Sequence, residues 1–366
     1  MPSIELLHRY PGLSRRRLLA ASAVLALSNA GLGSIAQADA RKPEKPGVIL
    51  AVNGKPALQY LPLTIADQFG WFKAEGIELE IVDMASSSRT WQAVATGTAD
   101  MVCGSYDQVL NLQARSQSAQ TFVMMGLTPQ IAFGYSVRNM PGNPQLADLR
   151  GKKIGVTAPG TSSHMVASHI VSRAGLAQSD VSYISVGSSA GAMAALRSGQ
   201  IDALCNGDPV MTSLTQRGEV QIAVDVRTVQ GTADIFGGPM PTACLSAPLD
   251  FVQKHPQTVQ AMTNAIVKAL KWLHACGPSD LLKMVPEAYL LGDRGLYLDT
   301  FQQMRDAISR DGVMPEEGPR TALKALLRFD ASVLKPGQMD LGRSFTNDYA
   351  RRAVGLTRPL GASSTV

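Results

Sequence analysis

The sequence GTADMVC at residues 97–103 is matched 102 residues later by GQIDALC at residues 199–205. Both stretches fit the pattern G-x-x-D-x-x-C, in which the glycine is suited to end a helix as its C-cap and the apolar residues are suited to a buried strand. The upstream turns agree as well, because Gly76 and Gly175 lie 21 and 24 residues before the two glycines. We therefore expect two similar lobes.

Strand-like and helix-like runs alternate around both stretches, and this order is typical of α/β architecture. From His255 to His274, apolar residues recur every three or four positions, which predicts an amphipathic helix. The chain beyond Cys244 is expected to be mostly helical. The predicted strands lie at residues 48–52, 77–83 and 99–104 in the first round and at residues 152–157, 181–186 and 201–207 in the second.

Residues 1–40 are predicted to be a twin-arginine export signal. The arginines at residues 15–17 precede an apolar run at residues 18–27, and Ala-Gln-Ala at residues 36–38 fits a cleavage site. The run is shorter than the roughly 20 residues that span a bilayer, so we expect a mature protein free in a bacterial periplasm. Without residues 1–38, which hold four arginines and one glutamate, the net charge falls from +5 to +2, and nothing favours nucleic-acid binding.

Four cysteines in an oxidising compartment raise the question of disulfides. Cys103, Cys205, Cys244 and Cys276 include no C-x-x-C pair and have no histidine at metal-ligand spacing. Buried free thiols are the expected state, ahead of a bridge or a zinc site. Cys103 and Cys205 hold equivalent places in different lobes, so they are not expected to reach each other.

Small hydroxyl residues gather where predicted strands lead into predicted helices, as in GVTAPGTSSHMV at residues 155–166. A phosphate cradle, a serine nucleophile and an anion-binding pocket are the three explanations to compare. A nucleotide-binding loop would need G-x-x-x-x-G-K-[ST] or G-x-G-x-x-G. Neither pattern is present at this turn, so no cofactor is expected.

The nucleophile explanation rests on GSSAG at residues 187–191, which fits G-x-S-x-G between a predicted strand and a predicted helix. Ser189 would be the nucleophile, with Asp208 or Asp225 and His255 or His274 as candidate partners. Both histidines lie in predicted helical sequence, where a structural role is the simpler explanation. No HGGG-like segment, which would supply an oxyanion hole, precedes the serine. Serine hydrolysis remains the alternative function.

Binding without chemistry fits the polar residues better. The carboxyl ends of parallel strands meet at one edge of a sheet, where helix N-termini present unpaired N–H donors. Each hydroxyl there has helix capping as its other role. Roughly four hydrogen bonds to a charged group, at about 1.5–3 kcal/mol each, suffice for micromolar affinity after entropic losses.

The motifs DQFGWFKAEGIELEIV, DLRGKKIGVTAPGTSSH, SRAGLAQSDVSYISVG and HPQTVQAMTNAIVKALKWL, in this order, resemble the nitrate/sulfonate/taurine-type substrate-binding proteins of ABC importers. The resemblance runs from about Val48 to about Leu327. It implies an α/β, two-lobed periplasmic-binding-protein-like (type II) fold, each lobe a mostly parallel sheet flanked by helices. The two crossings are expected at residues 135–139 and 241–245, which gives residues 41–136 and 245–366 to lobe 1 and residues 137–244 to lobe 2.

The same resemblance implies a periplasmic receptor that captures a small organic anion, a sulfonate or a carboxylate, in an interlobe cleft and delivers it to the transmembrane subunits of an ABC permease. A monomer without metal or cofactor is expected. Arg89 is expected either to be solvated on the helix surface or to make a charge-assisted bond to an anion, whereas Asp208 would suit a cationic group. The charge of the ligand therefore stays open. The ligand-binding residues that the resemblance implies are Tyr60, Ser87, Ser88, Ser105, Gln130, Thr161, Ser162, Ser163, His164, Ser188, Ser189, Asn206 and Asp208.

Some relatives of this fold synthesise a thiamine pyrimidine precursor with a CCCFC segment. This chain has no such segment, which argues against the synthase activity. Binding of a thiamine precursor or another heteroaromatic ligand stays open as an alternative.

Overall fold

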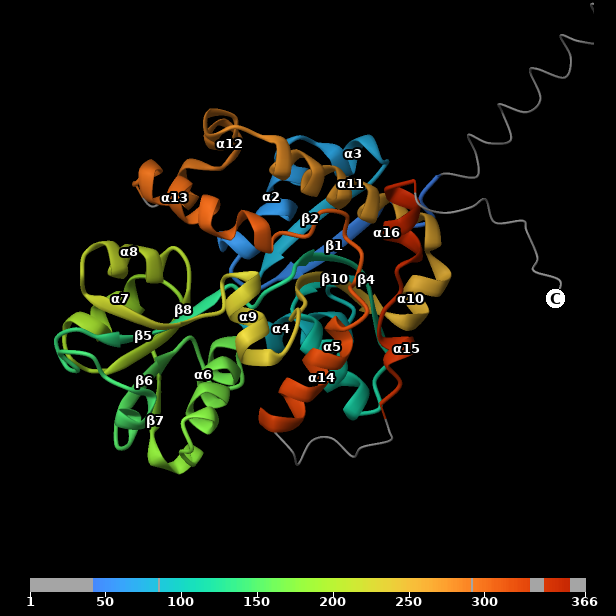
Figure 1. The fold of residues 1–366 in the computed structure, drawn as a ribbon. Helices are drawn as coiled ribbons and strands as arrows, with labels where there is room; N and C mark the ends of the chain where they lie inside the picture. Colours follow the sequence, from blue (N-terminus) through green and yellow to red (C-terminus); the bar gives the residue numbers. More distant parts are fainter. Residues whose placement is uncertain (1–41, 85, 291, 330–338, 356–366) are drawn as a thin grey trace, which may run out of the picture.

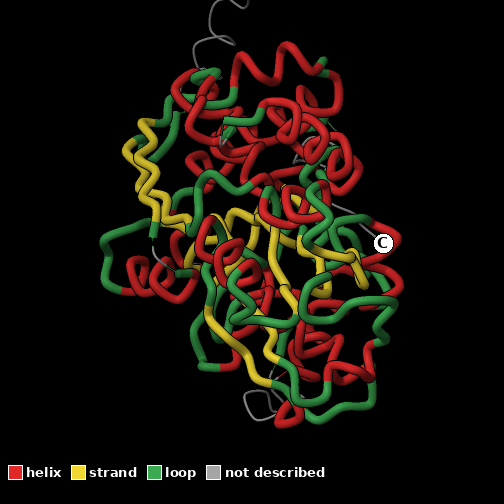
Figure 2. Tube along the Cα trace, turned by 90° about the vertical axis from the view of Figure 1, so that its left-hand side faces the viewer, coloured by secondary structure: helices red, strands yellow, loops and turns green. Residues whose placement is uncertain are grey.

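The computed structural model describes residues 42–84, 86–290, 292–329 and 339–355 of the 366-residue chain. The predicted export signal at residues 1–40 lies outside the described residues. The described residues form two five-stranded sheets that lie side by side, each with helices around it (Figure 1). A side view shows strands running through the middle of the molecule, with helices and loops around them, and further strands at one edge (Figure 2).

The first sheet has the strand order β2 (Glu78–Asp83), β1 (Gly47–Val52), β3 (Met101–Gly104), β10 (Thr242–Pro248) and β4 (Ala119–Gly126). The second has the order β7 (Ser182–Ser185), β6 (Lys153–Val156), β8 (Ala203–Gly207), β5 (Ile131–Ser136) and β9 (Val220–Asp225). The α-helices of the described residues are α2 (Leu61–Gln68), α3 (Trp71–Ala74), α4 (Ser87–Ala95), α5 (Tyr106–Ala114), α6 (Ser162–Arg173), α7 (Ala190–Arg197), α8 (Val210–Gln216), α9 (Val229–Phe236), α10 (Leu249–Lys254), α11 (Pro256–Ala275), α12 (Pro278–Met284), α13 (Arg294–Met304), α14 (Gly318–Phe329), α15 (Leu341–Ser344) and α16 (Asp348–Ala353).

The two sheets share one topology. Three neighbouring strands are parallel in each, and the fourth strand in the order is antiparallel to both of its neighbours. The reversed strand, β10 or β5, is the one that arrives from the other sheet. The predicted α/β fold with two mostly parallel sheets is confirmed, with one reversed strand in each.

The chain crosses between the sheets earlier than the sequence suggested. It leaves the first sheet at Gly126 and enters the second at Ile131, so β5 belongs to the second sheet. A lobe boundary at residue 136 would place β5 in the first lobe, and residues 127–130 are the corrected crossing. The return follows α9 and ends at Thr242, where β10 begins, close to the expected residues 241–245.

The G-x-x-D-x-x-C repeat has the same structural role in both sheets. Its glycines have φ of +75° and +79° and follow α4 and α7, a conformation in which glycine avoids the steric cost of a Cβ. Asp100 accepts a hydrogen bond from the backbone N–H of Ile49 at 3.0 Å, and Asp202 accepts one from Lys153 at 2.9 Å. Each aspartate therefore joins the entry of β3 or β8 to the adjacent parallel strand.

All four cysteines are buried and free, as predicted. Cys103 lies on β3 and Cys205 on β8, in different sheets. Burial raises the pKa of all four thiols. In the described part of the chain, no helix combines the length and apolarity that a membrane span requires.

The C-terminal helices contact both halves of the molecule. The long α11 packs on α2 and β4 of the first half. Helix α14 packs on α5, which follows β3, and also on α6, which follows β6. On another side, α13 packs on α8, and Gln216 Nε2 donates to Asp299 Oδ2 at 3.2 Å. The halves are therefore joined by helix packing as well as by the two crossings.

Candidate functional site

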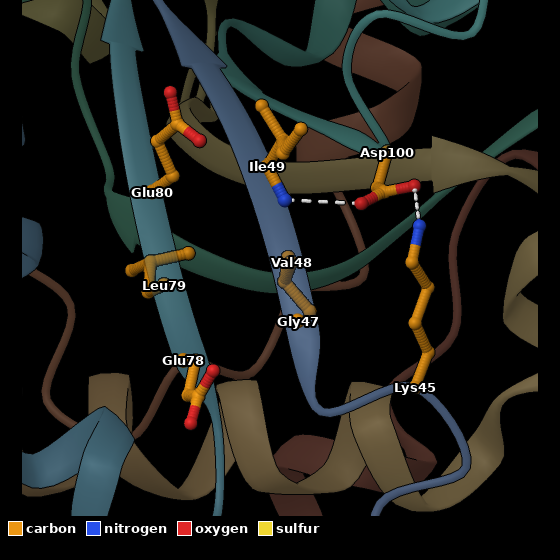
Figure 3. Close-up of a pocket in the computed structure, with 8 residues that line it drawn as sticks. All are labelled: Lys45, Gly47, Val48, Ile49, Glu78, Leu79, Glu80 and Asp100. Carbon is orange, nitrogen blue, oxygen red and sulfur yellow. Dashed lines mark hydrogen bonds and ion pairs between the residues drawn. The ribbon is translucent and has the colours of Figure 1, made fainter.

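A surface groove of about 560 Å³ opens beside β1 and β2 (Figure 3). Its walls include Glu78 and Glu80, and Asp100 is already paired with the Lys45 ammonium and the Ile49 N–H. The groove begins at the amino ends of both strands, opposite the edge where the predicted ligand loops lie. It is therefore a different surface from the site predicted from the sequence.

The first sheet's carboxyl-end loops are held together by Asp83. Its two carboxylate oxygens accept the backbone N–H groups of Gly54 at 2.7 Å and Lys55 at 3.1 Å, which ties the loop after β1 to the end of β2. In the next turn, Ser86 and Ser88 share a hydrogen bond of 3.0 Å between their hydroxyl oxygens. Ser88 is exposed and Ser87 half-buried, so α4 begins with hydroxyls that solvent can reach.

Ser105 and Tyr60 occupy two further carboxyl-end positions of the first sheet. Ser105 is the N-cap residue of α5 by backbone position, but its hydroxyl caps no backbone N–H group. Tyr60 directly precedes α2 and is buried, and this burial raises its pKa. Tyr60 therefore remains a neutral phenol at any physiological pH.

The hydroxyls at the start of α6 divide into two kinds. Ser163 is buried, and its Oγ accepts the Thr157 N–H at 2.9 Å and lies 3.0 Å from Thr161 Oγ1. Thr161 Oγ1 in turn donates to the Ala158 carbonyl at 2.6 Å. Ser162 is half-exposed and has no side-chain hydrogen bond to the described residues. Ser163 and Thr161 therefore hold the loop, while Ser162 is free to donate.

His164 is held in place by its neighbours. Its Nδ1 accepts the Gly160 N–H at 3.1 Å, so the proton of the neutral ring is on Nε2. The ring lies edge-on to Tyr183 and Phe329, with centroids 4.4 and 5.2 Å away. Burial lowers its pKa, so His164 is a neutral residue packed against aromatic rings.

The loops after β7 and β8 are joined by Asn206. Its amide nitrogen donates to the Gly187 carbonyl at 2.9 Å, and its amide oxygen accepts the Gly207 N–H at 2.9 Å. Ser188 and Ser189 follow Gly187 and are exposed. The structure thus brings these two hydroxyls beside the end of β8, as the topology requires.

The candidate hydrolase triad is not assembled. His274 Nε2 bonds to the Ile308 carbonyl at 3.1 Å, and His255 packs on Phe251 with ring centroids 4.7 Å apart. No described histidine hydrogen-bonds to Ser189. Among the described residues, Ser189 therefore has no histidine base placed to activate its hydroxyl.

Asp208 is occupied by a partner that the sequence analysis missed. Its side chain is 0% exposed, and its Oδ2 accepts Nη1 of Arg227, itself only 7% exposed, at 3.0 Å. Arg227 also forms a two-point pair with Asp225. Burial acts to lower the pKa of Arg227, but the hydrogen bonds and charges of both aspartates outweigh burial and raise it. Asp208 is therefore not available to a cationic ligand.

The first crossing lies against this cluster. Thr128 is fully buried, and its hydroxyl donates to the Arg227 carbonyl at 3.1 Å. Gln130 has a φ of +55°, and its buried Oε1 has no hydrogen-bond partner among the described residues. Its neighbour Ile131 pairs with Gly207, so Gln130 lies beside the end of β8. A buried amide oxygen without a partner is a group that a ligand or water can satisfy.

The described residues contain no group of three or more histidine, cysteine, aspartate or glutamate side chains suited to a metal ion.

A search of curated proteins found no match. The chain is similar to a solved structure from Bordetella bronchiseptica RB50, with 48% identity, 86% of this chain and 98% of that chain covered, and a TM-score of 0.81.

More distant structures share the fold. The alkanesulfonate-binding protein SsuA from Xanthomonas axonopodis pv. citri, bound to MOPS, is 16% identical with a TM-score of 0.66 over 83% of this chain and 99% of that one. The periplasmic nitrate-binding protein NrtA from Synechocystis PCC 6803 is 15% identical with a TM-score of 0.63, over 86% and 89%. The desulfurization enzyme DszB also has this fold, at 16% identity, a TM-score of 0.59 and coverage of 85% and 99%. The fold alone therefore does not separate binding from catalysis.

A family model described as NMT1/THI5 like matches residues 57–276. That range runs from the first carboxyl-end loop to the end of α11 and contains both sheets' candidate loops. The chain belongs to the NMT1/THI5-like family.

Proposed function

We propose that this protein is a periplasmic solute-binding receptor that captures a small organic anion between its two sheets and passes it to an ABC permease. The observation that carries the proposal is the repeated placement of hydroxyls at helix N-termini. Helices α4, α5, α6 and α7 each follow the carboxyl end of a strand, and each begins at serine or threonine residues. Unpaired N–H groups and hydroxyls at such positions favour an anion.

The ionic groups near these loops support an anion held by neutral donors. Asp208 is paired with Arg227, so its charge is already compensated. His164 is neutral, and Arg89 is exposed at the start of α4. A sulfonate or carboxylate would then be bound mainly by Ser88, Ser162 and similar donors. Of the ligand-binding residues implied by the resemblance, we propose Gln130 and the exposed or half-exposed serine hydroxyls as direct contacts.

Catalysis is the less well supported alternative. Ser189 lacks a histidine partner in the described part of the chain, and burial raises the pKa of every cysteine, which disfavours the thiolate needed for attack. The similarity to sulfonate- and nitrate-binding proteins supports binding of a small anion. Export by the twin-arginine route and action as a monomer are parts of the same proposal.

A thermal-shift screen of the protein without its first 40 residues tests the proposal. The probes are MOPS, alkanesulfonates, carboxylates and nitrate, with a thiamine precursor and a flavin as the heteroaromatic arm. A single-site ligand at a hundredfold excess over its dissociation constant adds about 2.7 kcal/mol of stability. Stabilisation by an anion is the expected result, and stabilisation by the heteroaromatic arm alone would overturn the anion assignment.

A matched pair of serine variants links binding to the loops. Ser188 and Ser182 are both exposed in the second sheet's half, but Ser188 follows β7 at its carboxyl end and Ser182 begins β7 at its amino end. Ser188→Ala is expected to weaken anion binding, and Ser182→Ala is not. Ester cleavage by the native protein that is lost in Ser189→Ala would instead establish a hydrolase.

A further inference from the structure

Arg227 lies where the chain starts its return to the first sheet, between β9 and α9. Its guanidinium is 7% exposed and donates through Nε and Nη2 to the two carboxylate oxygens of Asp225, at 2.8 and 2.6 Å. A two-point guanidinium–carboxylate pair fixes the plane of the group as well as its position. The orientation of Arg227 is thus set by the strand it follows.

The remaining nitrogen, Nη1, reaches the residue after β8 and the first turn of α8. It donates to Asp208 Oδ2 and to Thr212 Oγ1, both at 3.0 Å. Asp208 Oδ1 also accepts the Thr212 backbone N–H at 2.8 Å. The β8 loop, defined as residues 206–208 (the last two residues of β8 and the residue after it), is therefore attached to Arg227 through Asp208 by buried charge-assisted bonds.

The main chain of the same residue is bonded to the first crossing. The Arg227 carbonyl accepts the Thr128 hydroxyl, and the Thr128 carbonyl accepts the hydroxyl of Thr242, the first residue of β10. The Leu127 carbonyl accepts the Met240 N–H at 2.9 Å. Both crossings are thus bonded to each other, and Arg227 connects them to the β8 loop.

We propose that Arg227 is a positioning residue that couples the two crossings to the loop at residues 206–208, so that the orientation of the two sheets and the placement of this loop change together. The ligand part of this proposal rests on the proposed function. The coupling itself does not, because it concerns bonds within the chain. Charged groups buried in a low-dielectric environment resist separation, and this keeps the loop and the crossings in one arrangement.

The test measures the distance between the halves and the binding of MOPS in one set of variants. Nitroxide labels are placed on Ala95→Cys of α4 and Ala194→Cys of α7, which are both exposed, while the native thiols are buried. Arg227→Met removes the charge but keeps much of the apolar stem. The matched control is Arg197→Met, which breaks the exposed Arg197–Glu219 pair in the same half.

Arg227→Met is expected to broaden the distribution of label distances without ligand and to weaken MOPS binding by about tenfold, within the usual range of coupling between sites. Arg197→Met is expected to leave both unchanged. Arg227→Met also leaves the buried Asp208 carboxylate without this partner, which is expected to lower the unfolding midpoint. The double variant Arg227→Met with Asp208→Asn removes that charge. It is expected to recover the unfolding midpoint but neither the narrow distribution of label distances nor the affinity for MOPS, which separates positioning from stability.

Distances and affinity that return with stability in the double variant would overturn the proposal, because Arg227 would then only neutralise Asp208. Distances in Arg227→Met that match those in Arg197→Met would overturn it as well. If the native protein does not bind MOPS, the proposed sulfonate ligand fails, and the label distances measured without ligand still decide the role of Arg227.

Discussion

Ser163→Ala is expected to destabilise the protein although the serine lies in a stretch rich in hydroxyls. The Ser163 hydroxyl accepts the Thr157 N–H at 2.9 Å and bonds to Thr161 at 3.0 Å, and its side chain is buried. Alanine would leave the Thr157 N–H without its acceptor at the end of β6. A buried donor left without a partner costs about 1–3 kcal/mol.

Urea unfolding, followed by circular dichroism and tryptophan fluorescence, measures this cost. With a slope of about 3 kcal/mol per molar, the midpoint should fall by about 0.3–1 M at an unchanged slope. Ser162→Ala is the control, because Ser162 is half-exposed and has no side-chain partner among the described residues; a change within about 0.5 kcal/mol is expected. Equal midpoints for the two variants would refute the division of this stretch into a structural and a free hydroxyl.

Three further outcomes follow from the packing. Gly231→Ala should strongly destabilise the protein, because its Cβ would lie 1.9 Å from the Asp225 carbonyl oxygen, whereas Gly47→Ala meets no atom within 4 Å and should be neutral in the same urea assay. Burial raises the pKa of Asp107, so just above pH 3.8 the folded state binds more protons than the unfolded state, and at pH 7 the charged carboxylate destabilises the fold. Asp107→Asn should therefore raise the urea midpoint at pH 7. An unchanged or lower midpoint would contradict this. Burial lowers the pKa of His169, so the unfolded state binds more protons than the folded state once the pH falls through about 6.5. The native protein should therefore lose stability from pH 7.5 to pH 5.5. His169→Gln should lose less over the same range.

The two-sheet fold could be predicted from the sequence because the G-x-x-D-x-x-C repeat has a local structural cause. Asp100 and Asp202 each accept a hydrogen bond from the neighbouring parallel strand, so an aspartate is required at the equivalent position of both sheets. The crossing at residues 127–130 had no such signal. Strand β5 is buried along its whole length, and six residues of this kind fit the interior of either sheet.

The site was only partly predictable. The positions of the hydroxyl loops follow from the rule that the carboxyl ends of parallel strands share an edge. Ser162 and Ser163, however, are adjacent residues of the same type, and they differ only in which side of α6 they occupy. Arg227 was missed because its partner Asp208 is 19 residues away along the chain. Nothing in the spacing distinguishes a buried guanidinium from a solvated one.

The packing of α14 constrains how the molecule can open. A hinge made of two crossings alone would let the halves rotate freely, but α14 lies against both α5 and α6. Opening must therefore slide α14 over one of these helices, and interdigitated side chains permit only short displacements of this kind. In the proposed receptor, the motion that admits a solute should accordingly combine rotation with a small shear, and its extent should depend on the side-chain volumes along α14.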